Sequence, residues 1–167
     1  MSKLRRYPAM GRPYFITAVT HLRRPILVVN ADLLHTAFDV AKERTPHDLF
    51  AWVIMPDHLH LLLDAGQIEI SRIMQTLKMS FASNYRKRVG AKAGRTWQNR
   101  YWDHIIRDQE DFNHHFDYIH FNPVKHGITN SPFDWPHSSA ARCFEEGIYG
   151  EDWGSRESLT FDGDFGE

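Results

Sequence analysis

The pattern of apolar and polar residues changes period several times along the chain, and each change marks an expected element. Three runs rich in β-branched, aromatic or continuous apolar residues are typical of strands: residues 14–20, 49–55 and 58–63. Pro56-Asp57 between the last two runs is turn-forming, so we expect a hairpin there. A fourth strand is predicted over residues 101–106.

Apolar residues spaced three and four apart predict helices over residues 31–43, 68–89 and 110–121. The third helix is expected to stop at Asn122-Pro123, because the residue before a proline is disfavoured in the α region. A further short helix is indicated over residues 138–145.

This order, β-α-β-β-α-β followed by a helix, predicts an α+β fold of the ferredoxin-like, split βαβ type. Such a fold has an antiparallel sheet with helices packed on one face. We therefore expect the other face of the sheet to be open for a ligand. The fold alone does not identify an activity, because many functions use it.

Length and composition limit the class of protein. A chain of 167 residues fits one domain. Its apolar runs are too short to span a membrane, and no apolar stretch follows the basic N-terminus as in a secretory signal. The single cysteine excludes an internal disulfide and a multi-cysteine zinc site. We expect a cytoplasmic protein.

The net charge of −1 hides an asymmetry along the chain. Residues 144–167 hold eight acidic residues and one basic residue, whereas residues 1–143 hold 19 basic and 13 acidic residues. This predicts a basic body, 1–143, followed by an acidic tail, 144–167. A basic body with an acidic tail is typical of proteins that bind polyanions, although a solvated surface with a disordered tail has the same pattern. One hypothesis is that the tail folds over the basic groove and competes with DNA.

Two histidines in the predicted hairpin are the first candidates for chemistry. Because side chains alternate along a strand, His58 and His60 point to one face while Leu59 and Leu61 point into the core. Two adjacent imidazoles can hold one divalent metal ion together with at least one further ligand. A His-x-His pair alone is common by chance, and the ligand types do not identify the ion.

Tyr118 and Asn122 are the second pair of candidates, since residues four apart share a helix face. A tyrosine above the two histidines can attack a phosphorus atom, and the Asn122 amide oxygen can complete the metal's ligands. A phenol with an ordinary pKa near 10 needs its phenolate stabilised, for which the metal and Lys125 are candidates. The alternative is an ordinary tyrosine with a buried ring and a solvated hydroxyl.

Four ordered motifs extend these candidates to a known family: VIMPDHLH, LKMSFASNYRKR, WQNRYWDH and YIHFNPVKHG. With these motifs, residues 14–139 resemble the single-tyrosine HUH transposases, and among them the REP-associated tyrosine transposases. The resemblance implies that His58 and His60 bind Mg²⁺ or Mn²⁺. It also implies that Tyr118, on a C-terminal catalytic helix, cleaves single-stranded DNA, leaving a 5′-phosphotyrosine and a free 3′-hydroxyl.

The resemblance further implies a substrate and a role for Asn122. Asn122 stands where related enzymes carry a polar metal-shell residue, often glutamine, but asparagine is shorter and Pro123 follows it. The family's substrates are short palindromes that fold into hairpins. Relatives include both dimers and monomers, so the sequence leaves open whether the protein is a monomer or a homodimer.

Basic residues provide candidate contacts to DNA phosphates, for which the alternative is a solvated face. They are Arg5, Arg6, Arg12, Arg23, Arg24, Lys78, Arg86, Lys87, Arg88, Lys92, Arg95, Arg100 and Lys125. Interleaved aromatics such as Tyr85 and Trp97 can stack on unpaired bases or serve the core. If these basic residues hold DNA, binding should weaken steeply with salt, and a flat response would exclude them.

Three functions therefore compete. The first is a metal-dependent single-strand endonuclease and strand transferase, and the second is a non-catalytic, sequence-specific DNA-binding protein on the same fold. The third is a metal-dependent hydrolase that uses water, which ranks last because barrel hydrolases with a His-x-His start need a longer chain. A covalent DNA adduct that Tyr118→Phe abolishes would distinguish the first.

Overall fold

The computed structural model describes residue 7 and residues 11–155 and 159–167. Its four strands form one sheet in the order β2-β3-β1-β4, and all three neighbouring pairs are antiparallel. The strands are β1 (Pro13–Val19), β2 (Asp48–Ile54), β3 (His58–Asp64) and β4 (Trp102–Ile105). The predicted ferredoxin-like α+β fold is confirmed.

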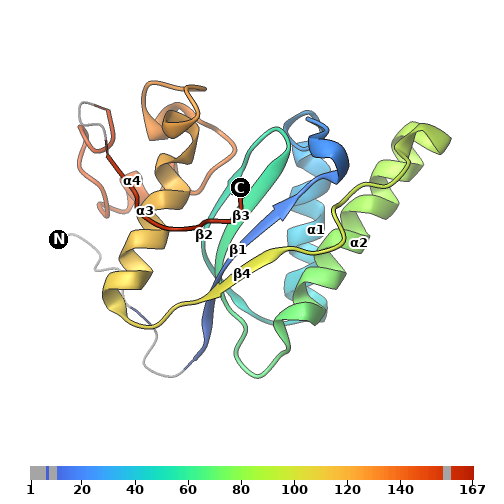
Figure 1. The fold of residues 1–167 in the computed structure, drawn as a ribbon, viewed down its shortest axis with the longest axis horizontal. Helices are drawn as coiled ribbons and strands as arrows, with labels where there is room; N and C mark the ends of the chain where they lie inside the picture. The colour runs from blue at the N-terminus through green and yellow to red at the C-terminus, as the bar shows by residue number, and fades with distance from the viewer. Residues whose placement is uncertain (1–6, 8–10, 156–158) are drawn as a thin grey trace.

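Helices lie on both sides of this sheet (Figure 1). The α-helices are α1 (Ala31–Arg44), α2 (Ile70–Val89), α3 (Gln109–Lys125) and α4 (Ala140–Glu145). Short 3-10 turns are η1 (His21–Arg23), η2 (Val28–Asn30), η3 (Gly90–Ala93) and η4 (Pro132–Asp134). Helices α1 and α2 pack together on one face, whereas α3 lies across the other.

The two faces of β3 contribute to two separate hydrophobic clusters. Leu59, Leu61 and Leu63 pack toward α1 and α2, as the alternation predicts. Leu62 packs in the second cluster, which contains apolar residues of α3. The face that carries His58 and His60 is therefore not open, contrary to expectation. It is covered because α3 has an apolar side of its own, including Phe112, Phe116 and Ile119, which must be buried against it.

Helix α3 runs past Pro123 to Lys125, so the predicted stop at Asn122-Pro123 is wrong. Proline has no backbone N–H, so α3 continues past Pro123 without the hydrogen bond that this N–H would have made to the carbonyl of Ile119. Gly127 ends the helix instead, with φ of +68°, a conformation that favours glycine. The N–H groups of Gly127 and Ile128 donate to the carbonyls of Val124 and Pro123, a pairing typical of helix C-termini. The added turn keeps Tyr118, Asn122 and Lys125 on one continuous helix.

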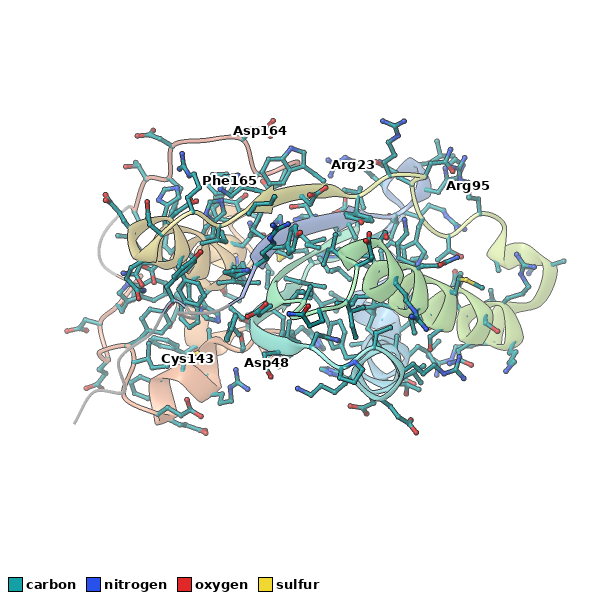
Figure 2. All side chains as sticks on the ribbon, turned by 90° about the horizontal axis from the view of Figure 1, so that it is seen from below. Arg23, Asp48, Arg95, Cys143, Asp164 and Phe165 are labelled. Atoms are coloured by element: carbon teal, nitrogen blue, oxygen red, sulfur yellow. The ribbon has the colours of Figure 1, made fainter. Side chains whose placement is uncertain are left out.

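The described part of the acidic segment packs on α3 rather than extending from the body. Tyr149 and Phe165 are buried in the second hydrophobic cluster, against which Trp153 and Phe161 also pack. Asp164 and Phe165 lie toward the α3 end of the molecule, whereas Arg23 and Arg95 lie toward the other end (Figure 2). The described end of this segment therefore lies against α3, and the hypothesis that the tail competes with DNA stays a prediction.

Among the described residues, the structure contains no helix that combines the length and apolarity needed to cross a membrane.

Candidate active site

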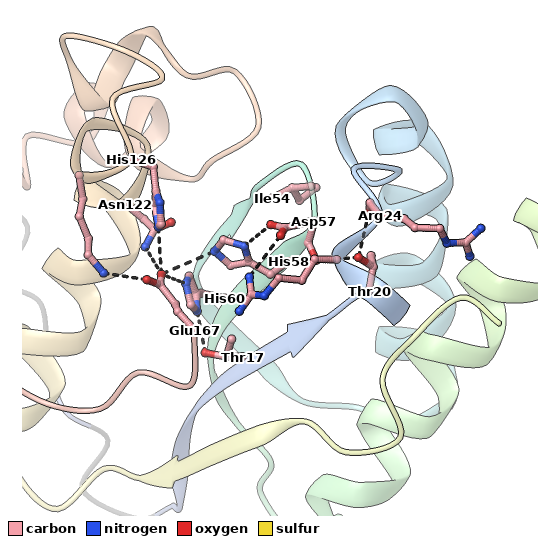
Figure 3. A network of polar contacts seen from close by, with 12 residues as sticks. Thr17, Thr20, Arg24, Ile54, Asp57, His58, His60, Asn122, His126 and Glu167 are labelled. Atoms are coloured by element: carbon pink, nitrogen blue, oxygen red, sulfur yellow. Dashed lines mark hydrogen bonds and ion pairs between the residues drawn. The ribbon is translucent and has the colours of Figure 1, made fainter.

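His58 and His60 lie side by side on β3, with ring centroids 4.9 Å apart, and both are buried (Figure 3). Each ring is held through its Nδ1 atom. His58 Nδ1 lies 2.7 Å from Asp57 Oδ1, and His60 Nδ1 lies 2.8 Å from Thr17 Oγ1. Thr17 is the partner of His60 in the pairing of β1 with β3. Partners at Nδ1 fix the ring orientation and leave the Nε2 atoms to bind a ligand.

A carboxylate from the end of the sequence meets the two Nε2 atoms. Glu167 Oε1 lies 2.9 Å from His60 Nε2 and 3.6 Å from His58 Nε2. Ligand atoms of these three residues lie within 4.8 Å of one another. Imidazole nitrogens with a carboxylate oxygen are a donor set that several divalent ions accept.

Two buried atoms at this place test whether a cation fits. His58 Nε2 and Asn122 Oδ1 have no hydrogen-bond partner among the described residues. A buried acceptor without a partner costs free energy, and a cation satisfies it. With Nδ1 bonded to a threonine oxygen, a neutral His60 also directs its lone pair toward the Glu167 carboxylate. The residues present therefore fit a divalent metal ion.

Helix α3 brings the tyrosine to the same place. The Tyr118 ring centroid is 5.4 Å from that of His60, and Lys125 Nζ donates to the Tyr118 hydroxyl at 2.9 Å. Lys125 Nζ also lies 2.7 Å from Glu167 Oε2, and Asn122 Nδ2 donates to Glu167 Oε1 at 2.7 Å. One chain thus brings together the predicted nucleophile, histidine pair and amide.

Burial and the carboxylate together set the charges of the site. Burial lowers the pKa of His60 to about 4, so this imidazole is neutral at pH 7. Burial acts in the same direction on His58, but the neighbouring carboxylates of Asp57 and Glu167 prevail and raise its pKa. Burial and the contact with Glu167 hold the pKa of Tyr118 far above its usual value, so the hydroxyl keeps its proton.

Glu167 stays ionised in this setting. Burial alone would raise the pKa of its carboxyl, but the polar contacts with His126, His58, His60 and Lys125 lower it well below the usual range.

Three residues at the end of the sequence close the site. The Phe165 ring stacks on Tyr118 with centroids 3.6 Å apart and planes 7° apart, which leaves Tyr118 1% exposed. Gly166 allows this path, since its φ is +72° and a Cβ there would lie 2.5 Å from Trp102. Phe165 therefore covers the Tyr118 ring in this conformation, and Glu167 contacts Lys125, which donates to the Tyr118 hydroxyl.

Sequence reasoning missed Asp57, Thr17, Phe165 and Glu167 as parts of the site. Asp57 was interpreted only as a turn residue, although its place beside His58 was a local signal. Thr17 was a polar residue in an apolar strand, but only the register shows that it faces His60. Glu167 carries no local signal, because 107 residues separate it from His60.

The basic residues do not form one continuous surface. Arg5 and Arg6 lie outside the described residues, and Arg12, at the start of β1, donates its N–H to Asp64. Most of the others lie near the exit of β1 and around α2: Arg23, Arg24, Lys78, Arg86, Lys87, Arg88, Lys92, Arg95 and Arg100.

Several of these basic side chains, and two of the aromatics, have structural partners. Arg24 donates to the carbonyl of Ala93, Lys78 to that of Gln98, and Arg88 to Asp32. Lys125 belongs to the tyrosine site instead. Tyr85 and Trp97 are buried in the core rather than free to stack on bases.

Comparisons with known proteins agree with this architecture. Residues 12–122, more than half of the chain, match the family described as "Transposase IS200 like". A REP-associated tyrosine transposase of Escherichia coli (strain K12) is 36% identical over 156 residues, 92% of this chain and 91% of that protein.

A solved structure gives the same result in three dimensions. The structure of a REP-associated tyrosine transposase bound to a REP hairpin superposes with a TM-score of 0.83 at 32% identity, covering 100% of this chain and 98% of the other. The chain therefore belongs to the IS200-like transposase family, among the REP-associated tyrosine transposases, and is a DNA transposase.

Proposed function

We propose that the protein cleaves and rejoins single-stranded DNA at hairpin-forming palindromes through a 5′-phosphotyrosine intermediate on Tyr118. The observation that carries this proposal is the convergence of the Tyr118 hydroxyl, Lys125 and the two Nε2 atoms of His58 and His60. A related structure bound to a REP hairpin supports hairpin DNA as the substrate class. As a DNA transposase it would act in the cytoplasm.

His58, His60 and Asn122 are the residues that would hold Mg²⁺ or Mn²⁺. A bound divalent ion would polarise a phosphate oxygen and stabilise the charge that develops on it. Glu167 would be a further oxygen ligand in the conformation described, and phosphate oxygens of DNA would take its place.

The residues of this chain account for the remaining steps. The Tyr118 oxygen forms a bond to phosphorus, and the bond from phosphorus to the 3′ oxygen of the preceding nucleotide breaks. The phenol gives up its proton to solvent, and Lys125, already donating to that oxygen, stabilises the phenolate that forms. The departing 3′ oxygen takes a proton from solvent and becomes the free 3′-hydroxyl. The tyrosine ester keeps the energy of the phosphodiester, so a 3′-hydroxyl can rejoin it without another energy source.

All of these groups come from one chain, so we propose that a monomer can cleave DNA. A mixture of Tyr118→Phe and His58→Ala proteins should therefore stay inactive. Recovered cleavage in the mixture would show that chains exchange their catalytic helices.

The direct test is incubation with Mn²⁺ and a REP hairpin that carries a single-stranded extension, followed by denaturing electrophoresis. We expect a covalent protein–DNA adduct that is absent in Tyr118→Phe and in His58→Ala. Binding without an adduct in the native protein would favour the non-catalytic alternative. Cleavage that persists in Tyr118→Phe would favour hydrolysis by water.

A further inference from the structure

The chain leaves β1 through a strained turn that presents an apolar side chain to solvent. Leu22 and Arg23 both have left-handed backbone conformations, with φ of 56° and 50°. Residues with a side chain seldom adopt this region, and two in succession are less common still. Leu22 is 79% exposed, the highest value among the large hydrophobic residues described. A strained backbone that exposes a leucine calls for a functional reason.

Neighbouring segments hold this turn in place. The Thr20 N–H donates to the carbonyl of Asp57 at 2.9 Å, and the His21 N–H donates to that of Thr96 at 2.9 Å. The Thr20 hydroxyl lies 2.8 Å from the carbonyl oxygen of Arg24, which closes the turn from within. The conformation is thus imposed from both ends.

The same turn is joined to the candidate active site through one carboxylate. Asp57 Oδ2 lies 3.2 Å from Arg23 Nη1, while Asp57 Oδ1 lies 2.7 Å from His58 Nδ1. In the pairing of β1 with β3, Val19 stands opposite His58, only three residues before Leu22. Leu22 therefore lies in the turn that adjoins the site, three residues after the strand position opposite His58, and its side chain is exposed to solvent there.

The surroundings of Leu22 are basic. Arg24 follows it in the turn and donates to the carbonyls of Ala93 and Arg95. Arg23, next to Leu22 in the turn, has a side chain that is 48% exposed. An apolar tip among guanidinium groups suits a partner with an anionic backbone and flat apolar faces, which is the chemistry of a nucleic acid base and its phosphates.

We propose that Leu22 packs against the exposed base face at the junction between hairpin stem and single strand. The inference rests on the proposed function, which requires an unpaired phosphate at Tyr118 close to a folded stem. Bases within a duplex already cover one another, whereas the terminal pair of a stem presents a free face. Contact there would set the distance from the stem to the phosphate that is cleaved.

The test compares DNA binding by Leu22→Asn with DNA binding by Met79→Asn. Both substitutions are made in the Tyr118→Phe protein, and binding is measured by fluorescence anisotropy in the presence of EDTA. Asparagine tolerates the left-handed conformation, and Met79 is an exposed apolar residue on α2, 62% accessible. The probes are a REP hairpin with a single-stranded extension, the extension alone, and a stem closed by a loop at both ends, which has no free terminal pair. We expect Leu22→Asn to weaken binding of the extended hairpin about tenfold and the other two less than about twofold, because only the junction offers the contact. Met79→Asn should change none of the three.

Equal weakening of all three probes by Leu22→Asn would overturn the inference, as would unchanged binding of the extended hairpin. Leu22→Gly separates the contact from the strain: it should lose junction binding and melt no lower than the native protein, because glycine relieves the backbone. A lower melting temperature would show that Leu22 is structural instead. Because these measurements need neither metal nor cleavage, they can fail or succeed independently of the proposed chemistry.

Discussion

The two faces of β3 are stabilised by different kinds of contact. On the face toward α1 and α2, Leu59, Leu61 and Leu63 are at most 1% exposed and pack among apolar residues alone. On the other face, His58 and His60 are buried just as deeply, yet each needs a polar partner from elsewhere. Burying an imidazole without polar partners costs free energy. On the second face Asp57, Thr17 and Glu167 provide those partners.

This difference predicts that neighbouring substitutions on one strand have unrelated effects. Leu61→Ala should lower the free energy of unfolding by about 2–5 kcal/mol through the cavity it leaves. It should spare Mn²⁺ binding at temperatures where the protein is folded. His60→Ala should weaken Mn²⁺ binding and adduct formation by more than about 100-fold, since our proposal makes His60 a metal ligand rather than an outer partner. Denaturation curves, Mn²⁺ titrations and adduct yields measured on both variants would check this; a His60→Ala protein with native Mn²⁺ affinity would refute it.

The partners that hold the imidazoles should matter less than the imidazoles themselves. Asp57→Asn keeps the size of the side chain but replaces the carboxylate that fixes His58. Mn²⁺ affinity should fall about 10–100-fold, the usual cost of losing such a partner. Asp48→Asn, on an exposed carboxylate of β2, is the matched control and should leave Mn²⁺ affinity unchanged. The account would fail here if both variants bound Mn²⁺ equally well, as isothermal titration would reveal.

Acid should lower the free energy of unfolding through the buried histidines, whereas the leucines of β3 contribute no dependence on pH. Burial lowers the pKa of His115, on α3, to about 4 from its ordinary 6.5. The folded protein therefore resists a proton that the unfolded chain accepts, and the resulting stability is complete above pH 6.5 and lost as the pH falls toward 4. Between pH 7 and pH 5 this group should remove about 2 kcal/mol from the free energy of unfolding. Urea denaturation at both pH values should show a smaller loss in His115→Gln, and an identical loss would contradict the assignment.

Removing the residues that close the site should have the smallest effect of the four. A chain that ends at Asp164 lacks Phe165 and Glu167, which cover Tyr118 and contact both histidines. We expect the rate of adduct formation to rise roughly tenfold, because a larger fraction of molecules then admits DNA. Glu146→Ala, on an exposed carboxylate at the end of α4, should leave the rate unchanged. A truncated protein slower than the native one would mean that Glu167 assists the reaction rather than blocking it.

The sequence allowed prediction where the determining contacts are local. Alternation along β3 placed His58 and His60 on one face, and a spacing of four placed Tyr118 and Asn122 together. The predicted end of α3 was wrong because it rested only on the unfavourable helical conformation of the residue before Pro123. The capping hydrogen bonds around Gly127 compensate for that cost.

The cover over the histidines could not be predicted, for a different reason. Burial of the α3 side and insertion of Glu167 depend on contacts between segments far apart in the sequence, such as Thr17 with Phe165 and Lys125 with Glu167. No periodicity or local motif records contacts of that kind. The distribution of charge therefore predicted an acidic tail, but it did not predict that the tail packs on α3 and contacts the histidines.

The central claim is that the Tyr118 oxygen becomes bonded to DNA beside the two histidines. Mass spectrometry of the trapped adduct, after protease and nuclease digestion, locates the modified residue directly. The account predicts a nucleotide phosphate on the peptide that contains Tyr118, formed only when His58 and His60 are intact. A nucleotide on any other residue, or an adduct of the same yield in His58→Ala, would contradict it.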